Sequence, residues 1–154
     1  MFRFLVVFLQ SKHITHHPNL KKSMLQQDYF LRILEEFGKA LSQFTQNKKD
    51  IKLKQQEILK LYDSYVGDSI FYHTATMDDI MDSFSRFPEE ERLDRIEMLA
   101  DLYYAESDLK TGPARDMLLD NARKLFIFIN HHSKTLSLSR QQRIMDITKK
   151  IGER

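Results

Sequence analysis

The side chains best suited to bind a partner gather near the middle of the sequence and in a helix predicted further along. Aromatic rings offer large apolar area and tyrosine hydroxyls add hydrogen bonds, a combination typical of recognition surfaces. The candidate partner-binding residues are Tyr62, Tyr65, Asp68, Phe71, Tyr72, His73 and Tyr104. The alternative is that the tyrosines pack between helices. Tyr72 and His73 lie in a predicted connector, so we expect them to be the most exposed members.

The same connector suggests a second kind of chemistry. Asp68, Tyr72 and His73 place a carboxylate, a phenol and an imidazole close together in the sequence. A small enzyme or a small-molecule-binding protein would need these groups to converge in a pocket. A pocket that holds His73 against Asp68 would favour this alternative. An open groove with a solvated His73 would favour a non-catalytic binding module.

Two groups of side chains could suggest a cation site: several histidines, and Asp78, Asp79 and Asp82, which we instead expect to cap a helix and complement its dipole. His13, His16 and His17 have the short spacing that imidazole ligands use, but no carboxylate or thiolate accompanies them. Adjacent His131 and His132 would point in different directions, and we expect them to satisfy carbonyls at a helix end. We therefore predict no metal and no cofactor.

Motifs of common enzyme classes are missing from the sequence. It has no phosphate-binding glycine loop, no Gly-x-Ser-x-Gly elbow and no His-Glu-x-x-His helix. Basic residues are interleaved with acidic ones, which argues against nucleic-acid binding. We therefore predict a non-catalytic protein that binds a protein or peptide. A homo-oligomer whose exposed aromatic residues bury one another is a further alternative.

The elements that carry these residues are all predicted to be helices. Apolar residues recur at helical spacing from Met24 onward, and no segment alternates as a strand does. Thr76 with Asp79, and Ser139 with Gln142, have the spacing of helix-capping pairs. The six predicted helices span about 26–46, 51–66, 77–87, 88–108, 113–130 and 139–151, with a connector between the second and the third.

The apolar stripes differ in width in a way that suggests stacked hairpins. The first and last predicted helices carry narrow stripes, whereas those at 88–108 and 113–130 are apolar over much more of their circumference. Inner helices of a stack touch two neighbours and need such broad faces. A six-helix globule with one central helix would show the same trend.

A family resemblance supports the stack. Leu99-Ala100-x-x-Tyr103 resembles the core of the first helix of a tetratricopeptide repeat, and Ala122-x-x-x-Phe126 resembles that of its second helix. Ile96 departs from the usual Trp, the closing Pro is missing, and the turn is longer than in the standard repeat. The stretch 67–109 also resembles a group of small bacterial proteins without assigned activity. The resemblance implies antiparallel helical hairpins with a groove for a peptide.

The bulk composition fits one helical domain. The chain has 154 residues, 42% hydrophobic and 30% charged, with no cysteine. Such values suit a single core and predict neither disorder nor a membrane span. The lack of cysteine fits a reducing compartment, so we expect a cytoplasmic location.

The first 23 residues differ from the rest. They contain four basic residues and no acidic one, and their apolar run Phe4–Leu9 is short for a signal peptide. We interpret 1–23 as a doubtful or disordered extension that precedes a single helical domain, 24–154. A short signal or anchor and an ordered accessory segment are the alternatives. Without the extension, 20 basic residues face 22 acidic ones and the formal charge falls from +2 to −2.

Overall fold

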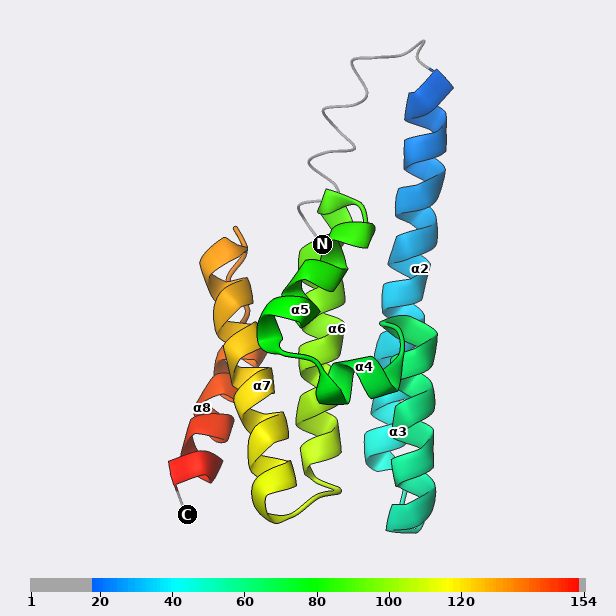
Figure 1. Cartoon of the computed structure of the whole chain (residues 1–154). Helices are drawn as coiled ribbons and strands as arrows, with labels where there is room; N and C mark the ends of the chain where they lie inside the picture. The colour runs from blue at the N-terminus through cyan, green and yellow to red at the C-terminus, as the bar shows by residue number, and fades with distance from the viewer. Residues whose placement is uncertain (1–17, 153–154) are drawn as a thin grey trace.

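The structure is a computed structural model that describes residues 18–152. Within this range the chain forms seven α-helices and one 3-10 helix and no strand, which confirms the all-α prediction (Figure 1). The elements are α2 (Pro18–Gln46), α3 (Ile51–Tyr65), α4 (Ser69–Thr74), α5 (Met77–Ser83), η1 (Phe84–Arg86), α6 (Glu89–Ser107), α7 (Gly112–His132) and α8 (Leu138–Gly152).

Helix α6 lies at the centre of the arrangement. It contacts α2 and α3 on one side and α7 on the other, and α8 packs against α7. Consecutive long helices run in opposite directions, and the short elements α4, α5 and η1 connect α3 to α6 (Figure 1). This arrangement is compatible with stacked antiparallel hairpins.

The broad apolar faces predicted for the inner helices are buried as expected. The fully buried side chains on α6 and α7 include Leu99, Ala100, Leu102, Tyr103, Leu119, Ala122 and Phe126. The contact between α6 and α7 is the most extensive of any helix pair in the described range. Ala100 and Ala122 have small side chains, which allows two helices to approach closely.

Two predictions about the ends of helices need correction. Helix α2 begins at Pro18, upstream of the predicted start near residue 26, so residues 18–23 of the predicted extension are helical and the remainder lie outside the described range. At the last helix the cap is Ser137 and not Ser139, because Ser137 Oγ accepts a hydrogen bond from Arg140 N at 3.2 Å. The prediction for Thr76 is confirmed, since its hydroxyl accepts from Asp79 N at 3.2 Å.

The predicted connector after α3 is also helical in part. Helix α4 begins after Asp68, whose Oδ1 accepts a hydrogen bond from Ile70 N at 3.0 Å. Asp63 at the end of α3 accepts from Ser69 N at 3.0 Å and fixes the turn between the two helices. The predicted helix 77–87 is divided into α5 and η1, and it ends where Phe87 is extended before Pro88.

Candidate functional site

The predicted partner-binding residues do not share one exposed surface. Tyr62 and Tyr72 are buried, with 0% and 1% of their surface exposed. Asp68 is exposed and serves as the cap of α4. The others, Tyr65, Phe71, His73 and Tyr104, are half-buried. The expectation that Tyr72 is exposed is therefore wrong.

The buried Tyr72 side chain anchors α4 to the rest of the domain. Its ring lies against Phe71 at 5.1 Å and Phe84 at 6.3 Å between ring centroids. Its hydroxyl accepts a hydrogen bond from Arg86 Nη2 at 3.2 Å. Gly67 adopts a φ of +141°, and a Cβ there would lie 2.7 Å from Arg86 and 3.3 Å from Tyr72. The backbone conformation thus favours glycine, and a Cβ would also have to displace the end of the Arg86 side chain.

His73 belongs to a buried polar network. Among the described residues, no hydrogen bond joins His73 to Asp68. Its Nε2 lies 2.7 Å from Glu106 Oε1, and its Nδ1 lies 2.6 Å from the Ser69 carbonyl oxygen. The Tyr62 hydroxyl donates to the same Glu106 oxygen at 2.7 Å. Glu106 is only 3% exposed, so this network joins α3, α4 and α6 inside the domain.

The network favours a protonated His73. Both ring nitrogens face oxygen acceptors, and only the imidazolium form can donate from both. Burial by itself lowers the pKa of His73, but the Glu106 carboxylate and the Ser69 carbonyl outweigh it and raise the pKa. Burial and the adjacent Glu106 also raise the pKa of Tyr62 well above its ordinary value.

Tyr65 and Tyr104 connect helices rather than forming one surface. The Tyr65 ring packs edge-on against Phe37 of α2, with 5.3 Å between centroids. The Tyr104 hydroxyl donates to Asp146 of α8 at 2.5 Å. The aromatic residues predicted as a site therefore contribute mainly to contacts between helices.

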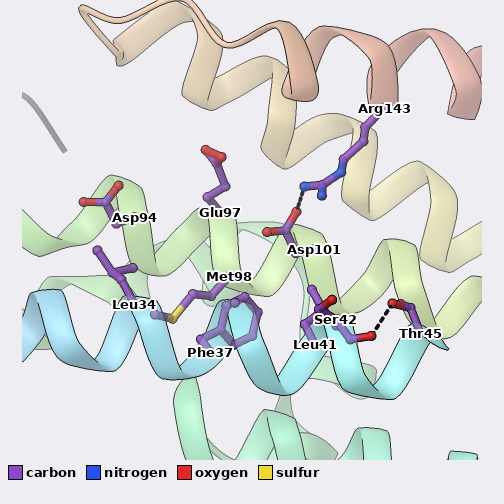
Figure 2. A pocket seen from close by; sticks show the side chains of 11 residues that line it. Leu34, Phe37, Leu41, Ser42, Thr45, Asp94, Glu97, Met98, Asp101 and Arg143 are labelled. Carbon is purple, nitrogen blue, oxygen red and sulfur yellow. Dashed lines mark hydrogen bonds and ion pairs between the residues drawn. The ribbon is translucent and has the colours of Figure 1, made fainter. Parts of the chain in front are cut away.

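A separate pocket lies between α2 and α6 and reaches α8 at its edge (Figure 2). Its volume is about 460 Å³, within the range of protein ligand pockets. We call it the α2–α6 pocket. It is lined by Leu34, Phe37, Gly38, Leu41, Ser42 and Thr45 from α2, by Asp94, Glu97, Met98 and Asp101 from α6, and by Arg143 from α8.

The α2 wall of this pocket contains a glycine that packing does not require. A Cβ built on Gly38 would meet nothing within 4 Å, and its backbone is ordinary helix. Glycine inside a helix destabilises it by roughly 0.5–1 kcal/mol relative to alanine. The effect of Gly38 is to leave space and exposed backbone between Leu34 and Ser42. An isolated glycine in a helical pattern was the signal in the sequence that could have revealed this wall.

The α6 wall is acidic. Asp94, Glu97 and Asp101 are spaced at i, i+3 and i+7, which places them on one face of the helix. Figure 2 shows the three carboxylates along α6, with Arg143 reaching Asp101 from α8. These acids were not among the predicted site residues, although three acids at helical spacing in a broadly apolar helix are a recognisable signal.

Two arginines of α8 hold this wall in place. Arg140 is buried, and its Nε donates to Glu97 Oε2 at 3.1 Å while its Nη1 donates to Asn130 Oδ1 at 2.8 Å. Arg143 forms an ion pair with Asp101. Burial raises the pKa of Asp101 to about 7; Arg143 opposes this rise and Glu97 adds to it. The wall therefore carries two ion pairs, Arg140–Glu97 and Arg143–Asp101, and burial raises the pKa of the Asp101 carboxyl.

No group of three His, Cys, Asp or Glu side chains in the described residues is placed to hold a metal ion. His13, His16 and His17 lie outside that range. The expected helix-end role is confirmed for His132, whose Nδ1 lies 2.9 Å from the Phe128 carbonyl oxygen.

Across residues 18–152, no helix has the length and apolarity needed to cross a bilayer. In comparisons with known proteins, no protein family, no curated protein and no solved structure matches the chain.

Proposed function

We propose that the protein is a non-catalytic helical module that binds a peptide or protein segment in the α2–α6 pocket. The observation that carries this proposal is Gly38, which leaves an unfilled space on the wall of a pocket between two long helices. A pocket of this kind, with apolar side chains between helices and polar groups at its edge, suits a segment that inserts side chains between the helices.

A tetratricopeptide-like architecture would explain where the pocket lies. In a stack of antiparallel hairpins, alternate helices lie on the same side and form a concave surface. The pocket is lined by α2, α6 and α8, which are alternate members of the series of long helices. The full burial of Ala100 on α6 and Ala122 on α7 supports the same architecture.

The alternative of a small enzyme or small-molecule-binding protein rested on Asp68, Tyr72 and His73. Asp68 caps α4, Tyr72 is buried and His73 is bound to Glu106. None of the three lines the α2–α6 pocket. These contacts account for each side chain by a structural role, so the binding module is the better supported proposal.

Selection from a displayed library of random 16-residue peptides tests the proposal. We expect the wild-type protein to enrich peptides that bind Gly38→Ala equally well and Gly38→Phe at least about tenfold more weakly, since the phenylalanine ring would occupy the pocket. Alanine is the matched control because it changes the same position and leaves most of the space open. Failure to enrich any peptide, or equal binding by Gly38→Phe, would contradict the proposal.

A further inference from the structure

One end of the domain brings together three segments that are distant in the sequence. They are the α2–α3 turn with the start of α3 (47–55), the α6–α7 turn with the start of α7 (108–116), and the end of α8 (149–152). Figure 1 shows all three at the lower end of the molecule. Gln55 Nε2 donates to the Leu109 carbonyl oxygen at 3.4 Å, and Lys150 Nζ lies 3.7 Å from Asp108 Oδ1, so the segments adjoin. We call this surface the turn end.

Basic side chains outnumber acidic ones at the turn end, even when the carboxylates that pair with its lysines from neighbouring turns are included. The carboxylates are Asp50, Glu57, Asp108, Asp116 and Asp146, and the basic side chains are Lys48, Lys49, Lys52, Lys54, Lys110, Arg115, Lys149 and Lys150. Glu57 pairs with Lys49, and Asp146 pairs with Lys150. Lys48 and Lys52 are exposed, and no ion pair between described residues involves either of them. The turn end therefore carries a net positive charge that its own carboxylates do not neutralise.

Two apolar side chains are exposed among these lysines. Ile51 and Leu53 occupy the first turn of α3, on either side of Lys52, and keep 58% and 50% of their surface exposed. The side chains that α3 buries in the domain, Ile58 and Tyr62, lie in later turns. Packing within the described part of the domain therefore does not account for an isoleucine and a leucine at this tip.

The combination fits the surface of an anionic bilayer better than it fits a nucleic acid. Anionic headgroups attract basic side chains, and the boundary just below them accepts apolar ones. A nucleic acid offers phosphates but no apolar layer for Ile51 and Leu53. None of the segments 47–55, 108–116 and 149–152 contains an aromatic residue that could stack on bases.

We propose that the turn end docks on a membrane surface that contains anionic lipids. Lys48 and Lys52 pair with the headgroups, and Ile51 and Leu53 enter the boundary between the headgroups and the acyl chains. The excess positive charge on the α6–α7 turn and on α8 strengthens the attraction. The contact is peripheral and requires no helix to cross the bilayer. It goes beyond the proposed function, because it does not involve a peptide in the α2–α6 pocket.

Sedimentation of the full chain with lipid vesicles tests this inference. We expect strong binding to phosphatidylcholine vesicles that contain about 30% phosphatidylserine, and binding at least about tenfold weaker to phosphatidylcholine alone. Lys52→Glu should weaken binding to the anionic vesicles about tenfold. Lys134→Glu makes the same change of charge on an exposed side chain beyond the other end of α7, and should leave binding within about twofold. Circular dichroism should show the same helix content in every variant.

A second variant separates insertion from charge attraction alone. Ile51→Ser combined with Leu53→Ser keeps the net charge and should weaken vesicle binding several-fold, because it removes the apolar area that enters the bilayer. Undiminished binding of this variant would overturn the inference, and so would equal binding by Lys52→Glu and Lys134→Glu. Absence of wild-type binding to the anionic vesicles would also overturn it. None of these results depends on the peptide selection, so failure here leaves the proposed function intact.

Discussion

At the scale of single residues, His73 shows how a sequence can suggest one role and the fold can supply another. Asp68 is its nearest carboxylate in the aromatic stretch, yet the partner in the structure is Glu106, from a different helix. Glu106 could not be identified in advance, because its pairing depends on the position of α4 against α6. The charged pair joins elements that the sequence alone leaves unconnected.

The His73–Glu106 pair makes stability depend on pH. The folded-state pKa of His73 is raised above its ordinary value near 6.5, so its contribution is fully present below that pH and is lost as pH rises through the folded-state pKa. We expect His73→Gln to lose about 1–2 kcal/mol of unfolding free energy at pH 6 and clearly less at pH 9. Urea denaturation of both proteins at the two pH values measures this. A loss that is the same at both would contradict the charged pair.

Replacing Gly38 is expected to raise the stability of the protein, whereas replacing His73 is expected to lower it. Its backbone is helical and the position of a Cβ is open, so Gly38→Ala should stabilise the protein by about 0.5–1 kcal/mol. Urea denaturation measures the change, with Gly67→Ala as a contrast. Gly67 has positive φ and a Cβ there would collide with Arg86, so that variant should be destabilised. Destabilisation by Gly38→Ala would show that packing, and not the pocket, requires the glycine.

At the scale of elements, the sequence predicted the long helices well because their apolar spacing is regular. The burial of Leu99, Tyr103 and Phe126 follows directly from that spacing. Helix α4 was missed because six residues are too few for a periodic pattern. Its start depends on hydrogen bonds that the carboxylates of Asp63 and Asp68 accept from backbone N–H groups. The pocket was missed because it depends on how α2 and α6 lie side by side, which spacing within one helix does not define.

Ala100 tests the packing of α6. It is fully buried, so Ala100→Leu should destabilise the protein by about 1–3 kcal/mol through overpacking. Ala114→Leu, on the exposed face of α7, is the matched control and should change stability by less than about 0.5 kcal/mol. Thermal or urea unfolding of the two variants provides the comparison. A neutral effect of Ala100→Leu would argue against a tetratricopeptide-like contact at this position.

Tyr72 tests the docking of α4. Because its ring is buried between Phe71 and Phe84, we expect Tyr72→Ala to lower the unfolding free energy by about 3–5 kcal/mol. Ile70 lies on the exposed side of the same short helix, and Ile70→Ala should have little effect. Equilibrium denaturation distinguishes the two. Wild-type stability in Tyr72→Ala would mean that α4 is not anchored by this side chain.

At the scale of the whole molecule, two regions were candidates for a functional role. The aromatic residues around α4 were predicted from the sequence to bind a partner, but their contacts are directed mainly into the domain. The α2–α6 pocket uses residues that individually look ordinary: a glycine, a serine and acids on a helix face. The pocket exists only because the fold places α2, α6 and α8 next to one another.

The amide signals of two glycines can distinguish binding in the α2–α6 pocket from binding at the α4 region. The chain has four glycines, and Gly38 and Gly67 mark the pocket and the α4 region respectively. The decisive measurement is a two-dimensional ¹H–¹⁵N spectrum of the full chain titrated with an enriched peptide. Binding in the pocket predicts that the Gly38 amide shifts progressively while the Gly67 amide stays in place. A shift of Gly67 with Gly38 unchanged would contradict the account and assign binding to the aromatic residues around α4.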